Sequence, residues 1–157
     1  MVKVKKEKFE RFTVKNSVFD LEKIDFDEIL LVKNPIIFDT NFLFVTFNFN
    51  VDVVGEIQRI VGGTYHLFIY EGTIKELEAI ERKGDKNKKF LPLIVKMLHV
   101  YGFKIIKSDK KYIDAQILAN LNKEVIVATN DKELRFKVQN KRCRVMYLRQ
   151  KSYLEIK

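Results

Sequence analysis

The sequence predicts one α/β domain of three layers, in which a central parallel sheet of about five strands is flanked by helices. The first observation is that short apolar segments alternate with segments of helical spacing from residue 35 onward. This order requires crossover connections and therefore a parallel sheet. The second observation is that 157 residues with 46% apolar content suffice for one domain with a real core and are too few for two.

Residues 35–41, Pro-Ile-Ile-Phe-Asp-Thr-Asn, predict the first central strand. Three apolar residues bounded by polar turn-formers are typical of a strand buried on both faces, and proline suits its first position because it has no N–H to donate. Asp39 then lies where the strand ends, at the edge where parallel sheets bind ligands. Thr40 or Asn41 is free to cap a following helix.

The N-terminal part of the chain has weaker patterns. Its first fifteen residues form a basic arm of mixed periodicity, which leaves open a strand added to a sheet edge or a mobile arm. Asp25 and Glu28 have the spacing of a capping box, so we expect a short helix over residues 26–32. We therefore divide the chain into a basic arm with a short helix, residues 1–34, and a main domain, residues 35–157.

Later elements follow from apolar spacing and from the glycines that end helices. The expected strands are residues 65–70, 103–107, 124–128 and 144–148. The expected helices are residues 51–61, 73–82, 90–101, 111–122 and 131–139. Residues 84–89 are expected to form a charged turn or a mobile loop.

Four acidic residues follow successive strands of the predicted sheet. Asp39 ends the first strand, and Glu76 lies in about the first turn of the helix after the second. Asp114 lies in the first turn of the helix after the third strand, and Asp131 follows the fourth strand. Because the carboxyl ends of parallel strands meet at one edge, we expect the four side chains to converge there.

Each acid also has an ordinary structural explanation. Thr73 with Glu76, and Asn130 with Glu133, have the spacing of capping boxes, and the helix dipole favours aspartate in a first turn. Four converging carboxylates would instead repel one another and require protonation or a cation. Hard oxygen ligands suit Mg²⁺ or Mn²⁺, which bind phosphate oxygens and activate water for phosphodiester hydrolysis.

The net charge of +9 is concentrated at the two ends of the chain. The first fifteen residues hold six basic and two acidic side chains, and residues 132–157 hold nine and two. Basic ends around a nearly neutral body indicate a polyanionic partner such as nucleic acid, although ordinary solvated surface is the alternative. Lys132, Arg135 and Lys137 are the candidate contacts on the last predicted helix.

The sequence gives little support to several other classes of protein. Neither an apolar run of membrane-spanning length nor a signal peptide is present, so we expect no membrane association and a cytoplasmic protein. Cys143 is the single cysteine, which excludes an internal disulfide, and with only His66 and His99 it makes a structural zinc cluster unexpected. The sequence contains no phosphate-binding glycine loop and no serine in a nucleophile-elbow context.

Four segments, in order, resemble the motifs of PIN-domain ribonucleases. They are residues 36–43, Ile-Ile-Phe-Asp-Thr-Asn-Phe-Leu; 73–78, Thr-Ile-Lys-Glu-Leu-Glu; 114–119, Asp-Ala-Gln-Ile-Leu-Ala; and 127–134, Val-Ala-Thr-Asn-Asp-Lys-Glu-Leu. The resemblance covers residues 35 to about 155. It implies four acids that bind a divalent metal, Mg²⁺ or Mn²⁺, for RNA hydrolysis: Asp39, Glu76, Asp114 and Asp131. It also implies that Asn41 and Thr129 support this site.

The resulting prediction is a divalent-metal-dependent RNA endonuclease that acts in ribosomal RNA processing. Asp39 and Asp131 are the expected main metal ligands, and Glu76 and Asp114 complete the site directly or through water. RNA is the expected partner, and pre-ribosomal particles and a second copy of the chain remain open as further partners.

Residues 145–149 with 153–155 resemble the archaeal and eukaryotic branch that processes small-subunit ribosomal RNA. That branch often has two adjacent acids in the third motif, whereas here Ala115 follows Asp114. The near alternative is a toxin ribonuclease of a toxin–antitoxin pair, and a second is a non-catalytic RNA-binding or ribosome-assembly factor. A third alternative is a phosphoacceptor receiver domain, which also places an aspartate at the end of a strand. Such a domain is expected to have further acids in the first motif, and residues 34–38 contain none.

Overall fold

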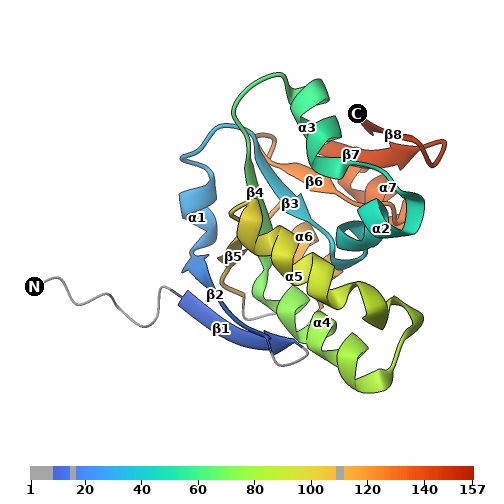
Figure 1. Ribbon diagram of the computed structural model, residues 1–157. Coiled ribbons are helices and arrows are strands. Elements are labelled where there is room, and N and C mark those ends of the chain that lie inside the picture. The colour runs from blue at the N-terminus through green and yellow to red at the C-terminus, as the bar shows by residue number, and fades with distance from the viewer. Residues whose placement is uncertain (1–8, 15–16, 109–111) are drawn as a thin grey trace, which may run out of the picture.

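The computed structural model describes residues 9–14, 17–108 and 112–157. Its strands form one sheet in the order β1-β2-β5-β4-β3-β6-β7-β8 (Figure 1). The strands are β1 Phe9–Val14, β2 Ser17–Ile24, β3 Pro35–Phe38, β4 His66–Tyr70, β5 Lys104–Ile106, β6 Ile126–Ala128, β7 Arg144–Arg149 and β8 Tyr153–Ile156.

The five strands from β5 to β7 in this order are parallel, which confirms the predicted α/β domain with a central parallel sheet. Antiparallel strands close the two ends, because β1 pairs with β2 and β8 pairs with β7. The α-helices are α1 Phe26–Ile29, α2 Val45–Phe49, α3 Val53–Val61, α4 Glu71–Lys83, α5 Leu91–Val100, α6 Ile113–Ala119 and α7 Lys132–Asn140. Within the described ranges there are also two 3₁₀-helices, η2 Thr40–Phe44 and η3 Lys86–Phe90.

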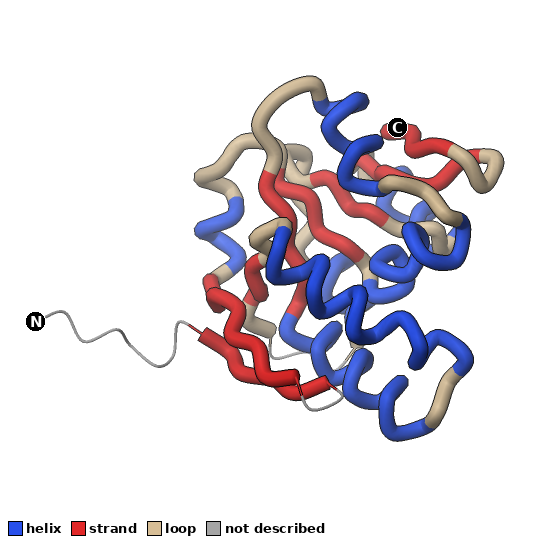
Figure 2. Tube along the Cα trace, viewed as in Figure 1, coloured by secondary structure: helices blue, strands red, loops and turns tan. Residues whose placement is uncertain are grey.

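Helices pack on both faces of the sheet and make the three layers (Figure 2). Successive residues of a strand point to opposite faces, so Ile36 belongs to the core on one face and Ile37 to the core on the other. The first core includes buried residues of α2, α3, α4 and α5, and the second includes those of α1, α6 and α7. Both faces of the parallel strands are therefore buried, as βαβ connections require.

The N-terminal segment contributes two strands, of which only the first was among the expectations. Residues 9–14 form the antiparallel edge strand β1, which is one of the two alternatives left open for the arm. The strand β2 was not predicted, because charged residues interrupt its apolar pattern and its parallel partner is the distant β5. The predicted capping box is present, since the Asp25 N–H donates to Glu28 Oε2 at 2.9 Å, but α1 ends at Ile29 rather than residue 32.

Other helix boundaries differ from the predicted ones because of local hydrogen bonds and turns. The helix α3 begins at Val53 because Asp52 caps it, with the side chain accepting from the Gly55 N–H at 3.0 Å. The helix α4 begins directly after Tyr70, so Glu76 lies in its second turn rather than its first. The segment expected to be a loop contains η3, and β8 was not predicted. None of the helices within the described ranges has both the length and the apolar character needed to cross a bilayer.

Candidate functional site

The topology brings the four predicted acids to the carboxyl edge of the parallel strands. Asp39 follows β3 directly, and its N–H donates to the Ala128 carbonyl at 2.9 Å, which joins the ends of β3 and β6. Glu76 lies on α4, the helix after β4, and Asp114 lies in the first turn of α6, the helix after β5. Asp131 is the N-cap of α7, after β6.

Asp39 is the most buried of these acids, with 5% of its surface exposed. This burial raises the pKa of Asp39 to about 6, against a hydrogen bond from Thr129 that lowers it. The charges of Asp114 and Glu76 raise it further. The carboxylate of Asp39 therefore interacts with two of the other acids across the ends of three strands.

The remaining acids are coupled in the same way. Burial raises the pKa of Glu76, and the charge of Asp114 adds to this shift. Burial also raises the pKa of Asp114, followed by the charge of Asp131, while Lys137 opposes the shift. Because each acid interacts with at least one other, the four form one electrostatically coupled group. We call this group the acidic centre.

Thr129 connects two members of the acidic centre. Its buried hydroxyl donates to Asp39 Oδ2 at 2.9 Å and accepts from the Asp131 N–H at 3.1 Å. An amide can only donate, so the single hydroxyl hydrogen is left for the Asp39 carboxylate. Thr129 thus fixes one oxygen of Asp39 relative to the backbone of Asp131.

Asp131 performs the capping role that the sequence had assigned to Asn130. Asp131 Oδ1 accepts from the N–H groups of Glu133 at 2.9 Å and Leu134 at 3.0 Å. The Asn130 side chain instead accepts from the Leu148 N–H at 2.8 Å, which ties the loop after β6 to β7. The Asn130–Glu133 capping box was therefore wrong, and the cap formed by Asp131 fixes the carboxylate of this member of the acidic centre at the start of α7.

Thr40 holds Glu76 and is itself bonded to Thr73, and sequence reasoning missed the role of both threonines. Thr40 Oγ1 and Thr73 Oγ1 lie 2.9 Å apart, and both residues are buried. Thr40 also bonds to the Glu76 side chain, which lowers the pKa of Glu76 against its burial. Thr73 lies three residues before Glu76 on the same helical face. This spacing was the feature of the sequence that could have placed Thr73 near Glu76.

The expected caps at the start of this region were wrong. The N-cap of η2 is Asp39, and no side-chain cap bond is present there. The Thr40 hydroxyl is turned to Thr73, and Asn41 is exposed in η2. Thr73 lies inside α4 and cannot form the capping box that its spacing with Glu76 suggested.

The sequence also did not predict a group of polar contacts among Lys23, Glu71, Ser108 and Gln116. Gln116, which is buried, accepts a hydrogen bond from the Ser108 hydroxyl, and the Ser108 N–H donates to Glu71 Oε2 at 3.4 Å. Lys23 forms an ion pair with the other oxygen of Glu71. These contacts join the ends of β2 and β5 to the starts of α4 and α6. They restrain the elements that carry Glu76 and Asp114.

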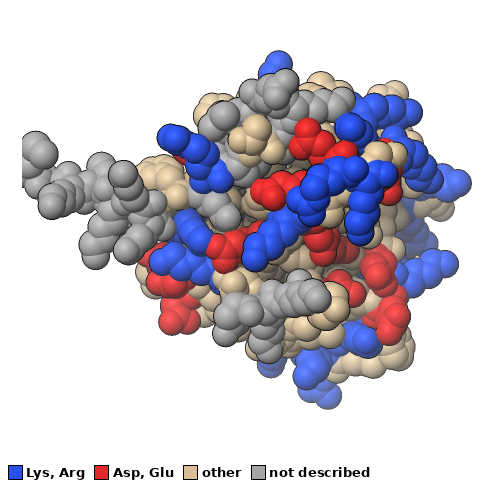
Figure 3. Space-filling model, turned by 90° about the horizontal axis from the view of Figure 1, so that it is seen from below, with Lys and Arg blue, Asp and Glu red and all other residues tan. Residues whose placement is uncertain are grey.

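The three basic residues predicted on α7 have different surroundings. Lys132 is exposed, whereas the Arg135 guanidinium lies over the Tyr147 ring, 4.4 Å from its centroid. Lys137 Nζ lies 3.0 Å from Glu133 Oε1, and its charge lowers the pKa of Asp114. Figure 3 views the molecule from below, where acidic side chains lie near the middle of the visible face with lysine and arginine side chains among and around them.

The donor chemistry of the acidic centre fits a hard divalent cation. No group of three or more His, Cys, Asp or Glu within the described ranges is arranged to ligate one ion directly. Mg²⁺ is commonly bound by one or two carboxylates with several retained waters and phosphate oxygens, so a full protein cage is not required. Repelling carboxylates with raised pKa values are the environment that such a cation would relieve.

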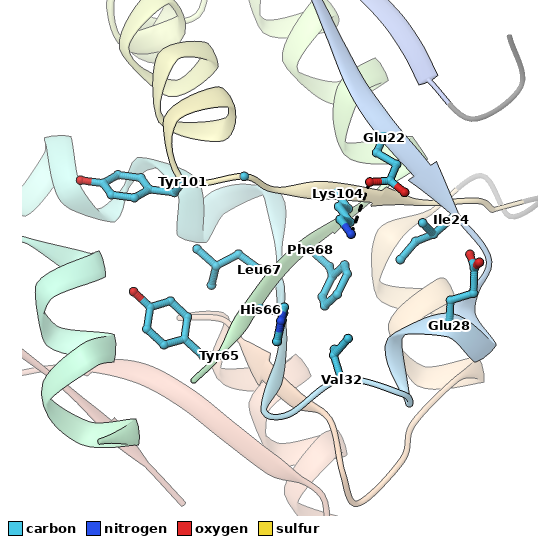
Figure 4. A pocket seen from close by; sticks show the side chains of 11 residues that line it. Glu22, Ile24, Glu28, Val32, Tyr65, His66, Leu67, Phe68, Tyr101 and Lys104 are labelled. Carbon is cyan, nitrogen blue, oxygen red and sulfur yellow. Dashed lines mark ion pairs between the residues drawn. The ribbon is translucent and has the colours of Figure 1, made fainter. Parts of the chain in front are cut away.

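A separate cavity of about 210 Å³ opens at the opposite, amino edge of the strands (Figure 4). It lies beside the starts of β4 and β5, where Glu22 Oε2 and Lys104 Nζ are 3.3 Å apart. His66, on its wall, bonds through Nδ1 to the Lys33 carbonyl at 2.9 Å. This histidine therefore has a structural contact far from the acids, and the cavity is not part of the acidic centre.

Comparison with known proteins finds a family model, a curated relative and a solved structure that resemble this chain. The model of a family described as "PIN like domain" matches residues 36–151. Ribonuclease VapC4 of Methanocaldococcus jannaschii is 36% identical over 121 residues, which span 75% of this chain and 92% of that protein. A solved structure of the PIN domain endonuclease Utp24 aligns with a TM-score of 0.65 at 19% identity, over 78% of this chain and 90% of that one. This last likeness concerns the fold alone.

Proposed function

Because the chain belongs to the PIN-like domain family, we propose that it is a divalent-metal-dependent RNA endonuclease. The observation that carries the proposal is the acidic centre, in which four carboxylates from four crossover units interact at one edge of the sheet. The repulsion within such a group destabilises the fold unless a proton or a cation neutralises it. A group of this kind therefore indicates a role in cation binding or proton transfer. The 36% identity to a protein named as a ribonuclease supports RNA as the substrate.

Each acid has a role that follows from its contacts. Asp39 and Asp131 would hold the ion, with Thr129 fixing the orientation of Asp39. Glu76, held by Thr40, and Asp114 would complete the site directly or through water. The ion, when bound, supplies a water of lowered pKa and neutralises charge on the cleaved phosphodiester.

The chain's own residues prepare this chemistry. Asp39 is buried in surroundings of low dielectric constant, where interactions between charges are strong. The hydrogen bond from Thr129 favours the ionised form of Asp39. Lys137 places a positive charge near Asp114, at the rim of the acidic centre. Lys132 and Lys137 are the proposed phosphate contacts on α7, and exposed Asn41 is a proposed supporting contact to the substrate.

Within this activity we propose ribosomal RNA processing first, on the sequence resemblance of residues 145–149 and 153–155, which form the β7–β8 hairpin. The second candidate is a toxin ribonuclease with an antitoxin partner, which the identity to Ribonuclease VapC4 favours. Ribosomal RNA fragments and unrelated single-stranded RNAs, cleaved under the same conditions, separate the two. A preference of about tenfold or more for one ribosomal position supports processing, whereas cleavage of many RNAs at one short motif supports a toxin.

The activity itself is tested with purified protein and both structured and single-stranded RNA, in Mg²⁺, in Mn²⁺ and in EDTA. We expect internal cleavage that depends on the metal. A preparation of Asp39→Asn purified in the same way is the control for contaminating nucleases. Binding without cleavage by the wild type, in every metal, would leave the RNA-binding or assembly factor as the better description.

A further inference from the structure

A second site lies between α2 and η3, apart from the acidic centre. It is a pocket of about 320 Å³, lined by two phenylalanines, two asparagines and two lysines: Phe47, Asn48, Lys86, Asn87, Lys89 and Phe90. We call it the Phe47–Phe90 pocket. None of the four acids lines it, so it is distinct from the proposed catalytic site.

The aromatic wall of this pocket is a stacked pair. The rings of Phe47 and Phe90 are 5.6 Å apart between centroids, with 20° between their planes. Both residues are partly buried and pack against the core cluster that includes α5, which holds the rings in place. A pre-formed, partly exposed aromatic surface is suited to stacking with a planar ligand, because little side-chain entropy is lost on binding.

The charged wall comes from a dense basic segment. Residues 82–89 contain five basic side chains and one acid, Asp85. Asp85 Oδ1 accepts from the Asn87 N–H at 2.8 Å, so this acid caps η3. Among the described residues, the ion pairs of the structure do not include Lys86 or Lys89, and Lys89 Nζ lies 5.0 Å from the centroid of the Phe90 ring. The lysines are therefore available to an external anion.

We propose that the Phe47–Phe90 pocket binds a single-stranded segment of RNA, with a base stacked on the phenylalanines and phosphates beside Lys86 and Lys89. Aromatic platforms combined with cationic side chains are the usual chemistry for unpaired bases and their backbone. Asn48 and Asn87 add amide groups, which can donate to and accept from base edges. A flat surface of lysines alone would attract phosphate but would offer nothing to a base.

The position of the pocket connects it to the acidic centre, and this part of the inference rests on the proposed nuclease function. The chain passes from Asp39 through η2 into α2, which carries Phe47, and from Glu76 along α4 to η3 (Figure 1). Glu76 and Lys83 are separated by roughly 10 Å along α4, at 1.5 Å per residue. An RNA strand of several nucleotides that is held in the pocket would extend along α4 toward the acids, and the pocket would then act as an anchor for the substrate.

The charge part of the proposal is tested by binding alone, in EDTA and in the Asp39→Asn background, so that cleavage plays no part. Affinity for a labelled oligouridine is measured across a salt series for Lys86→Ala/Lys89→Ala. Each lost phosphate contact lowers the slope of log affinity against log salt by about 0.7, so a decrease of about 1.4 is expected. The matched control is Lys123→Ala/Lys141→Ala, which removes the same charge from exposed positions at the opposite edge of the sheet. Equal slopes and affinities for the two double variants would overturn the proposal.

The base part is tested with Phe47→Leu, which removes the ring but keeps an apolar side chain. We expect a loss of about fivefold or more in affinity for oligouridine and no change for an abasic ribose–phosphate oligomer of equal charge. Equal losses on both oligomers would contradict base stacking. Equal competition by polyglutamate of the same charge would mark the pocket as a site for an acidic protein and overturn the RNA assignment.

A cross-linking experiment on the unmutated chain covers the case in which Phe47→Leu does not fold. Oligouridine containing 4-thiouridine is irradiated with the protein, and the modified peptides are identified by mass spectrometry. Cross-links to the peptides that carry Phe47 or Phe90 are expected. Cross-links confined to other segments would overturn the proposal even if the protein cleaves RNA, whereas absent cleavage with cross-links at these rings would count against the nuclease function only.

Discussion

The Thr129 hydroxyl joins Asp39 to Asp131: it donates to Asp39 Oδ2 at 2.9 Å and accepts from the Asp131 N–H at 3.1 Å. The two aspartates are far apart in the chain and follow adjacent parallel strands, β3 and β6. One fully buried threonine thus sets the orientation of one carboxylate relative to the segment that carries the other. A buried hydroxyl therefore holds the Asp39 carboxylate, and backbone N–H groups at the start of α7 hold the Asp131 carboxylate.

Asp39→Asn should reduce metal-dependent cleavage by about 10²-fold or more, because water activation and charge neutralisation both require the ion. The amide is close in size to the carboxyl group, so the fold should persist. Single-turnover cleavage of a defined RNA measures the effect. Asp27→Asn, an exposed residue on α1, is the matched control and should cleave at the wild-type rate. Unchanged cleavage by Asp39→Asn would contradict the assignment of Asp39 to the site and would point to a contaminating nuclease.

Thr129→Val should shift the pH dependence of cleavage. The Thr129 hydrogen bond lowers the pKa of Asp39, so its loss should raise that pKa and move the acidic limb of the rate profile to higher pH. Valine has a similar volume, and the shift should appear together with some loss of stability, because the Asp131 N–H loses its acceptor. Thr64→Val, at an exposed position before β4, should leave the profile unchanged. A profile that did not move would mean that the hydroxyl has only a packing role.

The metal-free protein should lose stability as the pH rises from about 4 to 6. The pKa of Asp39 is raised from 3.8 to about 6 in the folded state, so the native protein binds the proton more tightly than the unfolded chain in this window. Folding is therefore favoured by protonated Asp39, and ionisation costs on the order of 3 kcal/mol. Burial raises the pKa values of Glu76 and Asp114 in the same direction.

Denaturant unfolding in EDTA across this range measures the effect. In Asp39→Asn the decrease should be smaller, because the titrating group is gone. Parallel curves for the two proteins would show that Asp39 ionises normally and is not buried as described.

Asp114→Asn should leave the metal-free protein as stable as the wild type or more stable, because one of the repelling charges is removed. Metal should stabilise the wild type more than the variant. An ion at ten times its dissociation constant adds about 1.4 kcal/mol to a protein that binds it, which is roughly 3–6 °C in melting temperature for a domain of this size.

Melting curves of both proteins in EDTA and in Mn²⁺ separate this case from simple helix capping. If Asp114 only stabilised the start of α6, the variant would lose a few tenths of a kcal/mol or more in EDTA. Both proteins would then respond equally to the metal. That pair of results would contradict the acidic centre.

Lys132→Ala/Lys137→Ala should lower the salt dependence of RNA binding by about 1.4 in log–log slope, if each lysine contacts one phosphate. Arg135 is left in place because its guanidinium packs on Tyr147, so its removal would also disturb the fold. The exposed pair Lys123 and Lys141, changed to alanine in the same way, gives the baseline. A slope equal to that baseline would mean that the α7 lysines are ordinary solvated surface residues and do not contact RNA.

Much of the fold was predictable because its signals are local. The alternation of apolar strands with helical segments predicted the parallel centre, which the structure confirms. The strand β2, which lies between β1 and β5, was not predictable in this way, because its parallel partner β5 lies far along the chain and its own apolar pattern is interrupted by charged residues. The capping assignments at Thr73 and Asn130 failed for a related reason, since both side chains bond to other elements instead.

The sequence by itself determined where the four acids would lie, because a residue that follows a buried parallel strand reaches the carboxyl edge whatever the side-chain details. Tertiary structure alone decided how those acids interact. The burial that raises the pKa of Asp39 to about 6 comes from elements packed around the end of β3, and the Thr40–Thr73 contact joins two different crossover units. Desolvation and hydrogen bonding depend on distances between segments that no local pattern encodes, so the chemistry of the site became visible only in the folded chain.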